Sequence, residues 1–541
     1  MEKALEMGKT SATGSFQMLI GVAASTIIMA LGTIVLGRLL STDEYGLYGI
    51  VLVPATFINL FRDWGVNSAM TKYIATQRAT HKEEEIHNFL AAGLIFEVTT
   101  GIALSLLSLL LANLIATTVF QRPESASYIA ISSVAIISGS LLAVSQASFI
   151  GFERMELNSF TLICQAIVKT AVGPALVLLG YSVLGAVIGN VLGLAAAGII
   201  GLATFYFTLY KPLTKHATTE SSIRKTLGIM LRYGVPLSIY YGLGGILAQT
   251  YALLIIPLTS NTMYGNYLTA FNFSVLLTFL SVPIGTVLFP AFAKLDPDNE
   301  HELVRTVFAS SVKYTSILYI PATMAMMVLS GPMIGTLYGE KYVYGPFFLT
   351  LYVMGNLFTV LGSLSSGGFL SGLGKTTILM TQNIITFIIG IPLGLLLIPT
   401  IGIPGLIIAS TICGVPSMLW GLYWIWKHYE AKADLKSSTK ILAASTLAAA
   451  TTYLPISLLQ TANWIKLVIG LTIFLTVYIL GAPIIGAVTT TDIQNIRTMF
   501  SGLGTISRII NIPLRAAEKA SETKTTRKTR RKQKQQPPPN N

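Results

Sequence analysis

Charged residues are scarce in this chain. Asp, Glu, Lys and Arg make up 11% of its 541 residues, whereas a soluble domain averages about 25%. Hydrophobic residues make up 52%, and they come in runs of roughly 20, the length that a helix needs to cross about 30 Å of hydrocarbon. A transmembrane β-barrel would show short alternating strands instead. The composition therefore predicts an all-α polytopic membrane protein.

Cysteine and histidine are also rare. Cys164 and Cys413 both lie in predicted spans, so we expect small core residues and neither a disulfide framework nor a metal site. All five histidines fall in segments predicted to be cytoplasmic, which argues against a histidine proton relay across the membrane. The predicted outer loops are very short, and no nucleophile–base pair can be argued for them.

A phosphate-binding loop is missing as well. The nearest candidate ends in Gly374-Lys375-Thr376, but the position five residues before Gly374 is Phe369, where the motif requires glycine. We therefore expect no ATP hydrolysis by this chain and no cofactor. Coupling to an H⁺ or Na⁺ gradient, or to the membrane potential, stays open.

The hydrophobic runs predict fourteen spans. Their approximate ranges are 16–37, 49–70, 89–112, 128–150, 159–180, 183–208, 234–257, 265–290, 312–336, 346–371, 377–398, 403–426, 441–460 and 463–487. The first run is too long for the core of a signal peptide, and no small-residue cleavage site precedes a soluble domain. We expect it to remain as an anchor.

Lysine and arginine are distributed unequally between the two sides. With the N-terminus inside, 30 of the 36 fall in cytoplasmic segments and two, Arg62 and Lys169, lie within spans. The four in outer loops are Arg38, Arg122, Lys341 and Lys466. Positive residues concentrate on the cytoplasmic side of membrane proteins. The sequence therefore predicts a multi-pass protein of the cytoplasmic membrane with both termini inside.

An internal repeat is visible. Ser41-x-x-x-Tyr45-Gly46-x-Tyr48 is matched by Ser260-x-x-x-Tyr264-Gly265-x-Tyr267, and 151–154 is matched by 372–375 at nearly the same offset. The pairs predict two pseudo-symmetric six-helix halves in the same orientation, followed by two further helices. Parallel repeats of this kind place a substrate cavity at the interface between the halves.

The chain is accordingly divided into seven segments. They are a cytoplasmic N-terminus (1–15), an N-terminal half (16–208), a cytoplasmic linker (209–233), a C-terminal half (234–426), helices 13 and 14 (427–487), a possible interfacial amphipathic segment (488–517) and a basic tail (518–541). The tail cannot bury a core and is expected to be disordered. Its basic run suits anionic headgroups, although a simple solvated tail explains it equally well.

Four ionisable residues lie within predicted spans of the first half: Arg62, Asp63, Glu97 and Lys169. Each costs roughly 2.5–3.5 kcal/mol at the centre of a helix on insertion scales, so such groups usually face a cavity, form pairs or bind substrate. Arg62 and Lys169 are candidates for binding an anionic substrate, because arginine holds phosphate bidentately. Asp63 and Glu97 are candidate counter-ions or ion-coupling groups. The alternative is a buried structural pair.

Neutral polar and aromatic side chains gather in spans 7 and 8. Tyr240, Tyr241 and Gln249 lie in the first of these spans and Asn272 in the second. Hydrogen bonds and ring stacking suit a sugar, so these four are further candidate substrate-binding residues. Interhelical contacts explain them as well.

Several short motifs resemble a known family. They are Gly37–Gly46, Asp63-Trp64-Gly65 leading to Thr71–Ala75, and Phe289-Pro290-Ala291. With fourteen spans, they resemble the polysaccharide transporter (Wzx-type) branch of the multidrug/oligosaccharidyl-lipid/polysaccharide exporter superfamily over roughly residues 15–490. The resemblance implies a flippase that moves a polyprenyl- or dolichyl-pyrophosphate-linked oligosaccharide outward and holds the pyrophosphate with cavity arginines. Members often carry an acidic residue in span 7, where this chain has Gln249-Thr250-Tyr251, so ion coupling there is in doubt.

The leading hypothesis is a flippase that works by alternating access, with a lipid-linked oligosaccharide and membrane lipids as partners. Other glycan-assembly proteins are possible partners, and nucleic acid is not one. An ion-coupled multidrug exporter of the same superfamily is the first alternative. A membrane enzyme acting on lipid-linked sugars and a non-transporting assembly factor that recruits partners through its tail are the others.

Overall fold

The computed structural model describes residues 2–80, 83–213, 223–277, 292, 294–296, 299–500, 511 and 514–519. These residues form helices and connecting turns and no strand, which confirms the all-α prediction. Contacts divide the chain into two compact units. Unit 1 comprises 1–269 with 386–410, and unit 2 comprises 270–385 with 411–541.

Unit 1 holds the helices that carry the candidate site. Its helices are α1 (Glu2–Leu39), α2 (Thr42–Asn59), α3 (Val66–Ala79), α4 (Glu83–Leu114), α5 (Ala126–Ser132), α6 (Val134–Gly151), α7 (Met155–Leu176), α8 (Ser182–Phe205), α9 (Lys211–Leu213), α10 (Ile223–Ile255), most of α11 (Asn261–Ser274), the second part of α17 (Thr376–Ile401) and most of α18 (Ile403–Ile412).

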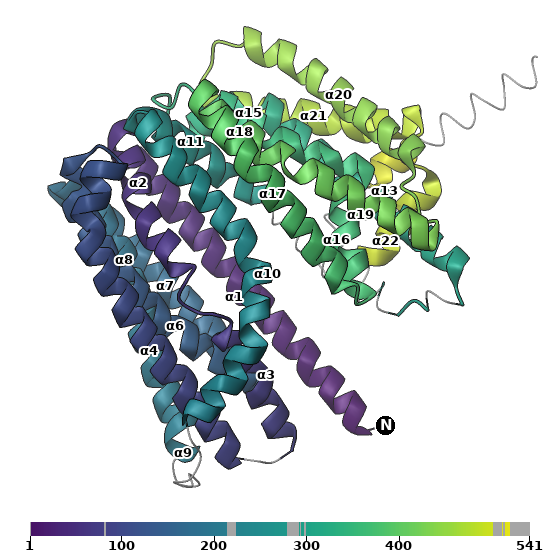
Figure 1. Ribbon diagram of the computed structural model, residues 1–541. Coiled ribbons are helices and arrows are strands. Elements are labelled where there is room, and N and C mark those ends of the chain that lie inside the picture. The colour runs from purple at the N-terminus through teal and green to yellow at the C-terminus, as the bar shows by residue number, and fades with distance from the viewer. Residues whose placement is uncertain are drawn as a thin grey trace, which may run out of the picture. The chain divides into compact units, whose positions relative to one another are not determined.

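Unit 2 holds the remaining helices. They are α13 (His301–Val328), α14 (Ser330–Leu337), α15 (Gly345–Met354), α16 (Ser363–Gly372), the first part of α17, α19 (Gly414–Tyr429), α20 (Leu435–Leu458), α21 (Asn463–Ile485) and α22 (Thr490–Phe500). Figure 1 shows both sets of helices, with unit 1 mostly purple to teal and unit 2 mostly green to yellow.

The fourteen predicted spans can be followed through the described residues except for 278–290, the larger part of the span predicted at 265–290, which lies outside them. Eight helical stretches are long and apolar enough to cross a membrane, or up to eleven when each sharply bent pair counts as one span. One of these stretches, Met155–Leu213, contains two helices, since α7 and α8 are joined at Gly180, whose φ is +93°. Counting α7 and α8 separately, and adding α2 with α3 as one broken span, gives thirteen, and α11 begins the remaining one.

The core of unit 1 fixes α3 against its neighbours. Val66, Met70 and Ile74 are spaced four residues apart, so they share one face of the helix, and all three are fully buried. They pack in a cluster that includes Leu90 of α4 and Val144 of α6. This packing holds the start of α3 in place, and the candidate site lies there.

The first repeat motif begins α2 with a capping box. The Ser41 hydroxyl accepts a hydrogen bond from the Glu44 amide (3.2 Å), and the Glu44 carboxylate accepts one from the Ser41 amide (2.7 Å). The second oxygen of Glu44 accepts a hydrogen bond from the Ser182 hydroxyl at the start of α8. The cap therefore also joins α2 to α8.

Removing this cap should have a measurable effect on stability. Ser41→Ala leaves the Glu44 amide without its side-chain acceptor, and we expect a loss of about 1 kcal/mol. Thermal unfolding of the detergent-purified chain measures the change. Ser41→Asn, which restores a capping oxygen, is the matched control. Equal unfolding temperatures for both variants would show that the cap contributes nothing.

The two repeat motifs meet each other within unit 1. A Cβ built on Gly46 would lie 1.8 Å from the carbonyl oxygen of Asn261, and one built on Gly265 would lie 2.3 Å from that of Thr42. The Asn261 side-chain amide also donates to the Asp43 carboxylate (3.2 Å). Two backbones can approach this closely only where neither residue has a side chain. The N-terminal ends of α2 and α11 therefore cross reciprocally at their glycines.

The segment after the last span packs onto unit 2. Ile493 of α22 is fully buried in a cluster with residues of α13, α20 and α21. Beside it, the Asp492 carboxylate lies 2.7 Å from the Lys313 ammonium and accepts two hydrogen bonds from Thr489. The start of the predicted amphipathic segment thus has a protein-facing side. Residues 520–541 of the predicted basic tail lie outside the described residues.

Candidate functional site

The second predicted span is broken where its charged residues lie. We expected one helix over 49–70, but α2 ends at Asn59 and α3 begins at Val66. Trp64 and Gly65 between them have φ values of +49° and +74°, a conformation that a helix cannot contain. The Asp63 carboxylate accepts a hydrogen bond from the Asn67 backbone amide (2.9 Å), so Asp63 helps to begin α3.

A close backbone contact supports this break. A Cβ on Gly65 would lie 2.1 Å from the carbonyl oxygen of Gly234 in α10, and one on Gly234 would lie 2.5 Å from that of Gly65. Both positions therefore require glycine. The contact fixes the path of residues 60–65 and with it the direction from which Arg62 enters the bundle.

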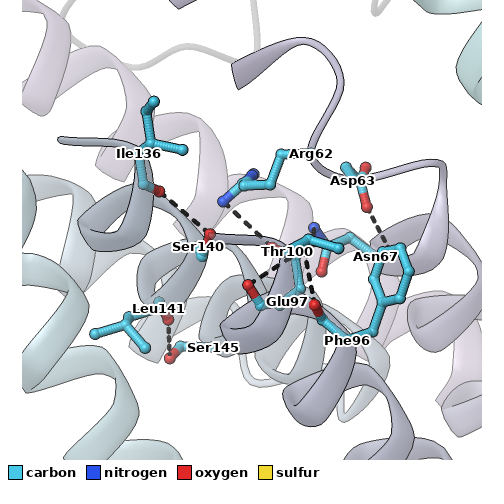
Figure 2. Close-up of polar contacts among 10 residues, drawn as sticks. All are labelled: Arg62, Asp63, Asn67, Phe96, Glu97, Thr100, Ile136, Ser140, Leu141 and Ser145. Carbon is cyan, nitrogen blue, oxygen red and sulfur yellow. Dashed lines mark hydrogen bonds and ion pairs between the residues drawn. The ribbon is translucent and has the colours of Figure 1, made fainter. Parts of the chain in front are cut away.

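Arg62 reaches from the break toward Glu97 in the middle of α4, as Figure 2 shows. One terminal guanidinium nitrogen (Nη1) lies 3.3 Å from the Glu97 Oε2 atom, and both side chains are buried. The other carboxylate oxygen of Glu97 accepts a 2.7 Å hydrogen bond from the Asn67 side chain. A buried ion pair with one added hydrogen bond is better compensated than a lone charge.

The ion pair leaves much hydrogen-bonding capacity unused. Arg62 Nε and Nη1, Glu97 Oε2 and the side-chain oxygens of Asn59 and Asn67 are buried and have no hydrogen-bond partner among the described residues. The 3.3 Å contact between Arg62 and Glu97 is thus an ion pair without hydrogen-bond geometry. Buried polar atoms normally have partners, and exceptions occur at functional sites. The arrangement leaves N–H donors of Arg62 unpaired inside the bundle.

A cavity of about 320 Å³ lies within unit 1 and meets this group at Asn59. Its polar lining residues are Thr56, Asn59, Lys169 and Asn190, and apolar residues of α2, α6 and α8 complete its wall. The Cβ position of Gly139 on α6 lies 3.9 Å from Arg62 Nη1 and 4.0 Å from the Asn59 oxygen. Asn59 therefore lies on the cavity wall and approaches the same point of α6 as the guanidinium, whereas Arg62 itself does not line the cavity.

Lys169 gives this cavity a positive charge. It lies in α7 and is half-buried, and it forms no ion pair with any residue in the described part of the chain. Close packing of α8 at Gly193 fixes its base, since a Cβ on Gly193 would lie 2.8 Å from the Lys169 Cβ atom. The structure thus pairs Arg62 with Glu97 and places Lys169 on the wall of the cavity that Asn59 also lines, all within unit 1.

The four candidate substrate-binding residues of the predicted spans 7 and 8 are not among the residues that line this cavity. Tyr240 and Gln249 are half-buried on α10 and do not line this cavity. The Tyr241 side chain lies outside the described residues. Asn272 belongs to unit 2. The sugar-binding role of these four stays a prediction.

Four polar residues of the site were not among the predicted site residues. Asn67 holds Glu97, and Thr56, Asn59 and Asn190 line the cavity. The signal for Asn190 was present, because it is the only asparagine in the otherwise apolar stretch 183–205. A single neutral amide in a span usually indicates an interhelical contact, so it does not stand out.

The sequence matches a family model described as "Polysaccharide biosynthesis protein" over residues 35–344. The lipopolysaccharide biosynthesis protein WzxC of Escherichia coli (strain K12) is 24% identical over 327 residues, 59% of this chain and 62% of that protein. The probable low-salt glycan biosynthesis flippase Agl15 of Haloferax volcanii is 22% identical over 213 residues, 39% of this chain and 43% of that protein. The matches thus span less than two thirds of these relatives.

A solved structure of the lipid II flippase MurJ in an inward closed conformation shares the fold. Its TM-score is 0.66 at 16% identity, with 86% of this chain and 98% of that chain covered. This likeness confirms the helical architecture that the spans predicted.

Proposed function

This chain belongs to the polysaccharide biosynthesis protein family, and from that premise we propose that it is a flippase for a lipid-linked oligosaccharide. The substrate we propose is an oligosaccharide on a polyprenyl or dolichyl (pyro)phosphate. It would cross the cytoplasmic membrane by alternating access, with both termini of the protein inside, for the synthesis of surface polysaccharide or glycoprotein. The names of WzxC and Agl15 support this substrate class.

The observation that carries the proposal is the buried cationic site of unit 1. The charges of Arg62 and Glu97 offset each other, while Lys169 adds a positive charge that no described carboxylate pairs with. Arg62 does not line the cavity, but its unsatisfied N–H groups are buried, and Nη1 and the oxygen of the lining residue Asn59 both lie about 4 Å from the Cβ position of Gly139. Such donors suit the oxygens of a phosphate or pyrophosphate, and the cavity volume lies in the range of about 300–1,000 Å³ typical of ligand sites.

The positive charge of this site argues against the first alternative function, an ion-coupled multidrug exporter. A multidrug exporter that takes up cations requires a site with negative charge, whereas Asp63 helps to begin α3 and Glu97 is paired with Arg62. The cavity itself presents Lys169 and two asparagines. An anionic substrate therefore fits the site better than a cationic drug.

Depletion of the protein in its host tests the proposal. Lipid-linked oligosaccharide should accumulate and stay inaccessible to a probe added outside the cell. Restoring the unaltered chain should remove the accumulation within one growth phase. Normal levels and normal exposure of the intermediate after depletion would contradict the flippase function, and loss of resistance to cationic drugs instead would favour the exporter.

A further inference from the structure

A second cleft lies in unit 2, at the bend between α13 and α14. These helices meet at 70°, and two adjoining cavities of about 360 and 460 Å³ open beside the bend. The cavities share four lining residues, Gly331, Pro332, Pro346 and Ile456. They therefore form one cleft between α14 and α15 on one side and α20 and α21 on the other.

The two ends of this cleft differ in chemistry. Glu340, Asn463 and Lys466 line the smaller cavity. The larger one is lined mainly by apolar groups, among them Met327, Phe347 and Tyr453. One end can thus hold a charged group while the other holds a hydrocarbon chain.

The polar end contains one charge of each sign. The Glu340 carboxylate accepts a 3.1 Å hydrogen bond from the Asn463 side chain and forms no ion pair in the described part of the chain. Lys466, in the first turns of α21, likewise has no ion-pair partner there. An ammonium group suits Glu340 and a phosphate suits Lys466. Together they match a zwitterionic headgroup.

The apolar end faces the region where lipid is expected. Phe347 is 57% exposed, Tyr453 62% and Trp464 59%. Aromatic side chains concentrate at the membrane interface, and Lys341 and Lys466 belong to the segments predicted to lie outside. A lipid of the outer leaflet would meet this cleft with its headgroup at the charged end.

We propose that this cleft binds a phospholipid of the outer leaflet, with a zwitterionic amine-bearing headgroup between Glu340 and Lys466 and one acyl chain along the apolar end. Gly331 provides room where the two cavities join, since a Cβ built there has no neighbour within 4 Å. The site lies entirely within unit 2 and shares no residue with the cationic site of unit 1. It would bind lipid whether or not the chain transports oligosaccharide.

Photocrosslinking tests this site. The full-length chain is placed in lipid nanodiscs that contain phosphatidylethanolamine with a photoreactive acyl chain, and labelled peptides are mapped by mass spectrometry. Labelling should concentrate in 327–350 and 453–466. Lys466→Ala should reduce it about tenfold, the effect of losing one charge-assisted bond, and Gly331→Leu should reduce it by blocking the cleft.

Gly481→Leu is the matched control. It lies on the same helix as Lys466, about 22 Å further along, and its Cβ also meets nothing within 4 Å. We expect no change in labelling with this variant. Uniform labelling of all exposed spans, or equal labelling of the unaltered chain and Gly331→Leu, would overturn the site. Stronger labelling by photoreactive phosphatidylglycerol or by a polyprenyl phosphate probe would overturn the assigned ligand.

Discussion

Arg62→Ala is expected to lower transport of the lipid-linked oligosaccharide about a hundredfold, because truncating one partner of a buried charged contact costs about 2–5 kcal/mol. Arg62 has unsatisfied buried donors near Gly139, and no other described arginine lies at this site. The measurement is flipping of the substrate by the purified chain in vesicles, read as exposure to an outside enzyme. Arg62→Lys keeps the charge but not the planar donor geometry, so it should recover part of the activity.

A second pair of variants separates binding from folding. Arg62→Ala leaves Glu97 buried without its ion-pair partner, which itself destabilises the protein. Arg62→Ala combined with Glu97→Gln removes both charges and should restore the unfolding temperature while transport stays low. Glu97→Gln alone should retain transport above the level of either Arg62→Ala variant. Full transport by the double variant would mean that Arg62 serves only as the counter-ion of Glu97.

Gly65→Ala is expected to destabilise the protein by at least about 3 kcal/mol. The residue has φ +74°, and a Cβ would lie 2.1 Å from the backbone oxygen of Gly234. Strain and overlap act together here, because neither backbone segment can relax by rotating a side chain. The break that presents Arg62 would shift as well, so transport should fall along with the unfolding temperature.

The matched control for this variant is Gly244→Ala on α10. Gly244 is exposed within the helix, and its Cβ would meet nothing within 4 Å. Alanine favours a helix over glycine by up to about 1 kcal/mol, so the control should unfold at the same temperature or slightly higher. Similar unfolding temperatures for both variants would refute the requirement for glycine at position 65.

The architecture was predictable because long apolar runs determine it. The fourteen spans and the paired motifs around Tyr45 and Tyr264 follow from hydropathy and spacing alone. Arg62, Glu97 and Lys169 also stand out, since ionisable groups are rare within spans. Their proximity in unit 1 could be suspected from the sequence, but the pairing of Arg62 with Glu97 over Asp63 could not be assigned.

The break in the second span was missed for a physical reason. Hydropathy reports how apolar a segment is, not whether its backbone is continuous, and residues 49–70 are apolar enough to suggest one helix. The signal was the order Asp63-Trp64-Gly65, in which a capping side chain precedes a glycine. That Asn59 and Asn190 line one cavity could not be predicted for another reason, since they are far apart in sequence and meet only in the fold.

The reciprocal crossing of α2 and α11 has a consequence for the ancestry of the chain. Gly46 and Gly265 occupy equivalent places in the two motifs, and each lies against the backbone of the other motif. That is the arrangement found at the two-fold axis of a homodimer, where one surface meets its own copy. If a duplicated gene for a six-helix subunit gave rise to this protein, one ancestral codon specified both glycines. A mutation there then affected both sides of the contact at once, whereas the fused chain must now retain each glycine by separate selection.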